Sequence, residues 1–124
     1  MRILSVDDST ATRLYIKRAV NVIGYEFLEA GDGKEGMEVI EREEGRIDLI
    51  LLDWHMPVMN GIEMLEALKS DGRYRHIPIS MVTVEVEREE IQKAIDMGAT
   101  NYLIKPFSQE NLIGKIMEGL SIEV

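Results

Sequence analysis

The chain has 124 residues, a length typical of one domain with a single sizeable core. Its net charge of −9 argues against a nucleic-acid-binding surface, which is normally basic. The sequence has no cysteine, which excludes disulfides and thiol chemistry, and no apolar run near the ~20 residues that a membrane-spanning helix needs. The acidic residue Asp7 lies so close to the N-terminus that it interrupts the apolar segment a secretory signal peptide would need. We therefore expect a cytoplasmic protein with no membrane partner.

Short apolar runs alternate with amphipathic stretches along the chain. The predicted elements, in order, are a strand at 2–6, a helix at 9–22, a strand at 25–29, a helix at 34–43, a strand at 48–52, a helix at 61–69, a strand at 78–82, a helix at 87–97, a strand at 101–104 and a helix at 109–120. The runs at 48–52 and 78–82 are almost entirely apolar, as expected for strands covered on both faces.

Capping residues support these helices. Ser9 or Asp8 can cap the first helix, and Ser108 can cap the last. The predicted helix ends carry glycine, at Gly24, Gly45 and Gly98. Five strand–helix units in alternation predict one domain over residues 1–124, an α/β fold whose parallel sheet has helices on both faces.

Charged and hydroxyl side chains occur where the predicted strands end. These residues are Asp7, Asp8, Asp53, Thr83 and Lys105. Each alone has an ordinary explanation, since a single Asp after a strand is usually a turn or cap residue. In a parallel sheet, however, all of these strand ends meet at one edge, where such folds bind ligands. The coincidence therefore indicates one site.

Three carboxylates in one crevice repel each other unless they hold a cation, and all-oxygen ligands with retained water suit Mg²⁺. A carboxylate beside that cation can attack phosphorus and form an acyl phosphate. Lys105 can then neutralise the transferred group, and the Thr83 hydroxyl can donate a hydrogen bond to it. The histidines His55 and His76 lack zinc-site spacing, so a zinc site is not expected.

The combined motifs resemble the receiver domain of bacterial two-component response regulators over essentially the whole chain. The segments that carry the resemblance are Asp7-Asp8-Ser9, Asp53-Trp54-His55-Met56-Pro57-Val58-Met59-Asn60-Gly61, Thr83 and Lys105-Pro106-Phe107. The Asp-Trp pair is similar to that of the stand-alone chemotaxis members. The resemblance implies a flavodoxin-like, doubly wound (βα)5 fold with strand order 2-1-3-4-5.

The resemblance also implies a role for each matched residue. Asp53 would be the phosphoacceptor, and Mg²⁺ would be bound by Asp8, Asp7, Asp53 and the backbone carbonyl of His55. Lys105 would pair with phosphoryl oxygens and join Pro106 through a cis peptide bond. Thr83 and Tyr102 would form the switch, with Tyr102 swinging inward as Thr83 moves toward the phosphoryl group. The His55 side chain could instead act as a base, a relay histidine or an exposed loop residue.

The resemblance implies partners as well. The phosphodonor would be a sensor histidine kinase, and output would pass through the surface of the fourth helix, fifth strand and fifth helix, at about residues 87–120. A flagellar motor switch protein and a phosphatase are candidate partners of an expected monomer. Met56 and Met59 beside the acceptor are candidate apolar contacts for the kinase.

One departure from the family pattern gives a kinetic prediction. Val84 follows Thr83 where the family more often has alanine or another small residue. Its branched side chain should narrow access to the phosphoryl group, so Val84→Ala is expected to speed phosphorylation by small donors, autodephosphorylation, or both. Glu85 and His55 could also repel or orient water there. Unchanged autodephosphorylation rates in alanine variants of all three residues would contradict this interpretation.

Two rival functions are less consistent with the sequence. A haloacid-dehalogenase-type phosphatase needs a second Asp two residues after its nucleophile, where this chain has His55. A flavin-binding domain needs a Ser/Thr/Gly-rich phosphate loop after the first strand, where Asp7 and Asp8 would repel phosphate.

Within the receiver class, three roles stay open: chemotaxis control, a phosphorelay intermediate and a receiver cut from a longer regulator. The start at Met1 and the end soon after the last helix favour a complete single-domain protein.

Overall fold

The structure is a computed structural model that describes residues 1–84 and 87–121. The strands are β1 (Arg2–Val6), β2 (Glu26–Ala30), β3 (Leu49–Leu52), β4 (Ile79–Thr83) and β5 (Asn101–Ile104). The helices are α1 (Thr10–Val22), α2 (Gly33–Arg42), α3 (Gly61–Lys69), α4 (Arg88–Asp96) and α5 (Gln109–Gly119). All five strands are parallel, in the order β2-β1-β3-β4-β5, which confirms the flavodoxin-like prediction.

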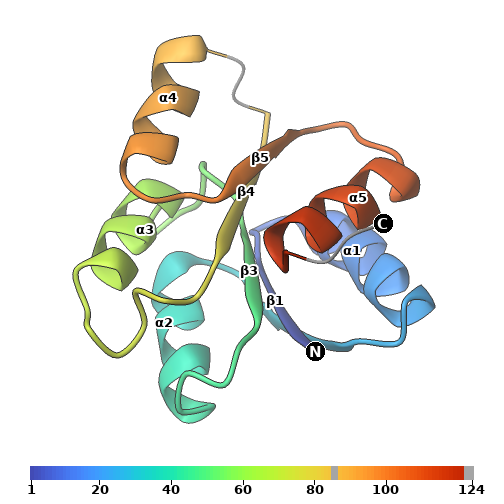
Figure 1. Cartoon of the computed structure of the whole chain (residues 1–124), viewed down its shortest axis with the longest axis horizontal. Coiled ribbons are helices and arrows are strands. Elements are labelled where there is room, and N and C mark those ends of the chain that lie inside the picture. Colours follow the sequence, from blue (N-terminus) through green and yellow to red (C-terminus); the bar gives the residue numbers. More distant parts are fainter. Residues whose placement is uncertain (85–86, 122–124) are drawn as a thin grey trace.

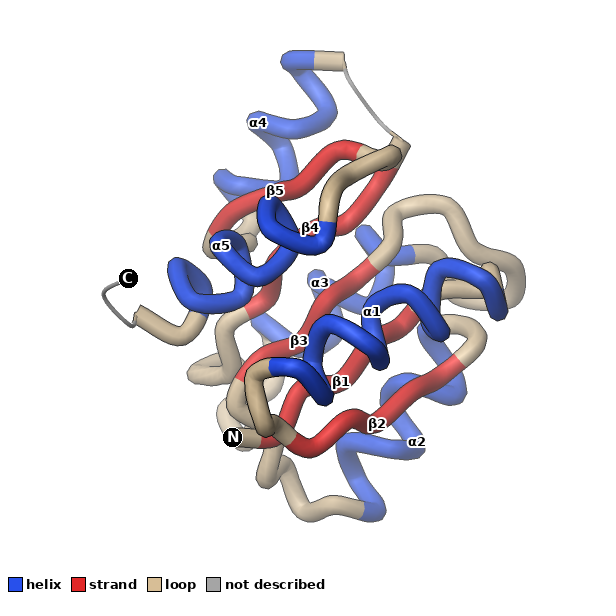
Figure 2. The backbone as a smooth tube through the Cα atoms, turned by 90° about the vertical axis from the view of Figure 1, so that its right-hand side faces the viewer, coloured by secondary structure: helices blue, strands red, loops and turns tan. Residues whose placement is uncertain are grey.

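The helices form two layers around the sheet. Helices α1 and α5 pack together over one face, and α2, α3 and α4 cover the other (Figures 1 and 2). Every residue of β3 and β4 is buried, as expected for central strands covered on both faces, and the only polar residues in them are Ser80 and Thr83 of β4. Within the described ranges, none of the helices has the length and apolar character needed to cross a membrane.

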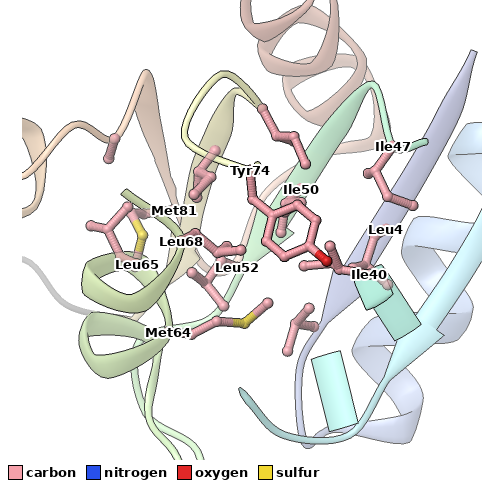
Figure 3. Close-up of a cluster of buried hydrophobic side chains, with 14 of the residues drawn as sticks. Leu4, Ile40, Ile47, Ile50, Leu52, Met64, Leu65, Leu68, Tyr74 and Met81 are labelled. Atoms are coloured by element: carbon pink, nitrogen blue, oxygen red, sulfur yellow. The ribbon is translucent and has the colours of Figure 1, made fainter. Parts of the chain in front are cut away.

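The larger core lies between the sheet and the α2–α4 layer. Met64 and Leu68 of α3 and Tyr74 from the following loop pack near Ile50 and Leu52 of β3 (Figure 3). Met64, Leu68, Ile50 and Leu52 have no exposed surface, so this packing fixes the position of β3 and the loop that follows it. The central strand is thereby a rigid support for Asp53.

The predicted caps and helix ends are confirmed in detail. Ser9, rather than Asp8, caps α1 and accepts a hydrogen bond from Thr12 N–H, while Ser108 caps α5. Gly24, Gly45 and Gly98 have positive φ angles. Helices commonly end at a residue in this conformation, which glycine adopts most readily. Predicted and observed element ends differ by at most one residue. For example, β2 begins at Glu26 and not at residue 25.

Candidate functional site

The side chains predicted for the site come together at the carboxyl edge of the sheet. Asp7 and Asp8 follow β1, Asp53 follows β3, Thr83 ends β4, and Lys105 follows β5. Backbone pairing sets their positions, because the Asp53 N–H donates to the Val6 carbonyl oxygen at 2.9 Å. Across the sheet, the Lys105 N–H donates to the Thr83 carbonyl oxygen at 2.8 Å.

The ammonium group of Lys105 joins two buried acids. Its Nζ lies 2.7 Å from Oδ2 of Asp7 and 3.3 Å from Oδ2 of Asp53. Asp7 is 1% exposed and Asp53 is 5% exposed, so water screens these charges poorly. Lys105 therefore compensates for the repulsion between the Asp7 and Asp53 carboxylates, which would otherwise destabilise the folded chain.

The pKa values of Asp53 and Lys105 are both raised, for different reasons. Burial raises the pKa of Asp53, the charge of Asp7 raises it further, and Lys105 and the backbone amide of His55 only partly offset this. For Lys105, burial favours the neutral amine, but the hydrogen bond and charge of Asp7, together with Asp53, outweigh it and raise the pKa. The two pKa shifts show that the site makes the charged form of Asp53 less favourable and the charged form of Lys105 more favourable.

The raised pKa of Asp53 predicts how stability depends on pH. Folding favours protonated Asp53, so this contribution is present below the unfolded-state pKa of about 3.9 and is lost as pH rises through the higher folded-state pKa. At pH 7 without Mg²⁺, we expect Asp53→Asn to raise the free energy of unfolding, because the amide removes a buried charge that Asp7 repels. The gain should shrink toward zero as pH falls below about 4. Urea titrations in EDTA measure it, with the exposed Asp8→Asn as a smaller-effect control. A less stable Asp53→Asn protein at pH 7 would refute the argument.

The same acids have the donor chemistry of a magnesium site. One carboxylate oxygen from each of Asp7, Asp8 and Asp53 lies within 4.8 Å of the others. Asp7 and Asp53 are buried whereas Asp8 is exposed, so a cation held here would keep one side open to water. Mg²⁺ prefers oxygen ligands and retains several waters, and it would relieve the repulsion between these acids. The residues present therefore fit the expected ion.

The remaining predicted residues surround this cluster. The Thr83 side chain is buried at the end of β4, and the peptide bond between Lys105 and Pro106 is cis. The backbone amide of His55 hydrogen-bonds to Asp53, while the His55 side chain is exposed.

Tyr102 is 38% exposed on β5, with Lys115 Nζ 5.8 Å from its ring centroid. The tyrosine is therefore directed outward here, which is one of the two positions that the switch prediction requires.

The structure bears on one prediction about neighbouring residues and leaves another untested. Met56 and Met59 are only partly exposed and pack against the core, so they offer less contact surface than the sequence suggested. Val84 is 61% exposed beside Thr83, and Glu85 lies outside the described residues. The more exposed apolar residue in the loop after Asp53 is Val58, at 77%.

Sequence reasoning included Asn60 and Gly61 in the family motif but missed how they shape the loop after Asp53. Gly61 is buried so close to the loop that a Cβ there would lie 2.1 Å from the Asp53 carbonyl oxygen. The neighbouring Asn60 caps α3 in a reciprocal pair with Glu63. The Asn-x-x-Glu spacing gives a sequence signal for this cap. The glycine contact gives none, because it depends on how two backbone segments approach each other.

Comparisons with known proteins agree with this geometry. The model of the response regulator receiver domain family matches residues 3–117. Chemotaxis protein CheY1 of Helicobacter pylori is 38% identical over 117 residues, covering 94% of each chain. Chemotaxis protein CheY of Pseudomonas aeruginosa is 38% identical over 117 residues, 94% of this chain and 93% of that protein.

Solved structures give the same result. Chemotaxis protein CheY4 of Vibrio cholerae superposes with a TM-score of 0.88 at 35% identity, and the match covers 96% of this chain and 98% of that one. A CheY-like receiver domain from Methanospirillum hungatei gives a TM-score of 0.87 at 33% identity, over 97% and 93% of the two chains. Sequence and fold thus agree along nearly the whole chain, which belongs to the response regulator receiver domain family.

Proposed function

We propose that this protein is a phosphorylation-activated signalling switch whose phosphoacceptor is Asp53. One observation carries the proposal: a cation, Lys105, and two further acids converge on a single recessed carboxylate at the edge of the sheet. The phosphodonor would be a sensor histidine kinase, as is general for CheY-like receiver domains. The protein would catalyse its own phosphorylation and dephosphorylation without transforming an external metabolite.

The residues of the site suit this transfer. An Asp53 carboxylate oxygen would form the new bond to phosphorus as the bond between phosphorus and the donor imidazole nitrogen breaks. The leaving nitrogen keeps the bonding electron pair and takes a proton from solvent. Mg²⁺ held by Asp7, Asp8, Asp53 and the His55 carbonyl would neutralise charge on the phosphoryl oxygens. Lys105 would exchange its bond with Asp53 for one with the phosphoryl group, and Thr83 would donate a hydrogen bond to it.

The output surface would be formed by α4, β5 and α5. A groove of about 500 Å³ lies between α4 and β5, lined by Arg88, Ile91, Gln92, Ile95, Tyr102 and Ile104. An inward movement of Tyr102, coupled to Thr83, would change the wall of this groove and so its affinity for a partner. The mechanism would couple charge added at Asp53, after β3, to a surface on α4 and β5, with β4 between the two strands.

The similarity to chemotaxis proteins favours a cytoplasmic, monomeric regulator of a flagellar motor. Its partners would be a kinase, a motor switch protein and a phosphatase. A single-domain phosphorelay intermediate is the alternative, and it predicts onward transfer of phosphate from Asp53 to a second histidine. A haloacid-dehalogenase-type phosphatase instead predicts release of phosphate from external substrates.

Intact-mass measurement after incubation with acetyl phosphate and Mg²⁺ tests the proposal. We expect one added phosphoryl group in the wild type, none in Asp53→Asn, and none when EDTA removes the metal. An autophosphorylated histidine kinase should serve as a second donor. If neither donor labels the wild type, Asp53 is not a phosphoacceptor. A label that persists in Asp53→Asn would assign the acceptor to another residue.

A further inference from the structure

Val58 has an unusual backbone conformation for its residue type. Its φ is +67°, in the left-handed region that β-branched residues avoid. The other described non-glycine residues with positive φ, Glu44 and Ser121, lie just beyond helix ends, where this conformation is common. Val58 instead lies in the middle of the loop between β3 and α3, so its conformation is not explained by a helix end.

Neighbouring backbone groups hold this conformation in place. The Met59 N–H donates to the Pro57 carbonyl oxygen at 2.7 Å, which closes a three-residue turn around Val58. The Met59 carbonyl oxygen in turn accepts a hydrogen bond from the Gly33 N–H of α2 at 3.0 Å. Turns of this kind with a positive central φ are rare and strained, and they persist when the surroundings fix them.

The strain holds an apolar side chain out in solvent. Val58 is 77% exposed, so core packing does not compensate for its backbone conformation. Glycine or asparagine would adopt this φ more readily and would expose less apolar surface. Stability therefore gives no reason for a valine here, and strained residues near active sites commonly have a functional role.

The position of Val58 suggests what it contacts. Its loop follows β3 and begins at Asp53, which is only 5% exposed. A phosphohistidine carried on a protein can reach such a recessed carboxylate only if the donor's surface rests on the surrounding loops. Val84, 61% exposed just after the adjacent strand β4, would provide a second apolar contact on the same edge. A small donor such as acetyl phosphate needs neither contact.

We propose that Val58 is a docking contact for the histidine-phosphorylated protein donor, whose surface next to the phosphohistidine would carry apolar side chains. The inference rests on the proposed phosphoacceptor role of Asp53. The site would then have two separate parts. The acidic cluster and Lys105 would carry out the transfer with any donor, whereas Val58 would be needed only to bind a protein donor.

Variants of Val58 can be compared with two donors, an autophosphorylated histidine kinase and acetyl phosphate. Val58→Asn suits the positive φ but removes the apolar contact, and Val58→Leu keeps an apolar side chain without the β-branch. We expect Val58→Asn to lower the rate constant with the kinase about 10-fold, the scale of losing one good interface contact. Its rate with acetyl phosphate should stay within about two-fold of wild type, and its thermal midpoint should rise. Val58→Leu should keep most of the kinase rate.

Val22 offers a matched control. It is 68% exposed at the end of α1, on the opposite edge of the sheet, so Val22→Asn should leave both rates unchanged. A kinase rate in Val58→Asn equal to that of Val22→Asn would overturn the docking contact. Equal losses of rate with both donors would also overturn the docking contact. The substitution would then act by changing the position of Asp53, which both donors need. Labelling of the wild type by acetyl phosphate but by no kinase would overturn this inference alone. Labelling by neither donor would overturn the proposed function as well.

Discussion

Gly61→Ala is expected to destabilise the protein and to slow the proposed phosphorylation of Asp53 at the same time. The added Cβ would lie 2.1 Å from the Asp53 carbonyl oxygen and 2.9 Å from both the Asp53 carbonyl carbon and the Trp54 Cα. All three are backbone atoms, so no side-chain rotation can relieve the overlap. We expect the free energy of unfolding to fall by about 3 kcal/mol, at the upper end for overpacking. Urea titration measures this change.

The same substitution should also slow phosphorylation. The loop from Asp53 to Gly61 has to move for the methyl group to fit, and a displacement of about 1 Å near reacting groups can lower a rate about 100-fold. Rates with acetyl phosphate can be measured by intact mass under conditions where the variant remains folded. A wild-type rate in Gly61→Ala would show that the loop adapts without moving Asp53.

Gly114→Ala is the matched control for the glycine argument. Gly114 lies within α5, and a Cβ built there has no heavy atom within 4 Å. Alanine is a better helix former than glycine, so this variant should gain up to about 1 kcal/mol of stability and keep the wild-type phosphorylation rate. Destabilisation of both variants to the same extent would mean that the close contact at Gly61 is not the cause.

Lys105→Met should have the second large effect, on stability and on catalysis together. Without the ammonium group, Asp7 and Asp53 lose the cation that joins them at 2.7 and 3.3 Å. In EDTA we expect the free energy of unfolding to fall by about 3 kcal/mol, as for other buried ion pairs that lose one partner. Mg²⁺ should restore more stability to the variant than to the wild type, because the metal would then be the main positive charge between the acids.

Phosphorylation of Lys105→Met should remain slow even when Mg²⁺ restores its stability. Loss of one group that stabilises transition-state charge typically lowers a rate about 100-fold or more. Lys17→Met, which removes an exposed lysine of α1, is the control and should match the wild type in both assays. A normal phosphorylation rate in Lys105→Met at saturating Mg²⁺ would remove Lys105 from the proposed chemistry.

Local sequence signals were sufficient to predict the alternating strands and helices and the parallel sheet, whereas the strand order was implied by the family resemblance. The apolar runs at β3 and β4, the caps at Ser9 and Ser108, and the glycines after α1, α2 and α4 each depend on a few neighbouring residues. Alternation of strands and helices then leaves few ways to arrange a parallel sheet. The convergence of Asp7, Asp53 and Lys105 could be predicted because a parallel sheet brings its strand ends to one edge.

The contacts that determine how the site works required the tertiary structure. Lys105 bonds more closely to Asp7 than to Asp53, and the raised pKa of Asp53 depends on burial that no local pattern encodes. The sequence favoured Met56 and Met59 as exposed contacts, but both pack against the core, and the exposed large apolar side chain of this loop is Val58. Composition and spacing determine which side chains reach one edge of the sheet. Their burial, and the strain at Val58, arise from the approach of distant backbone segments, because exposure and electrostatic screening are properties of the packed chain.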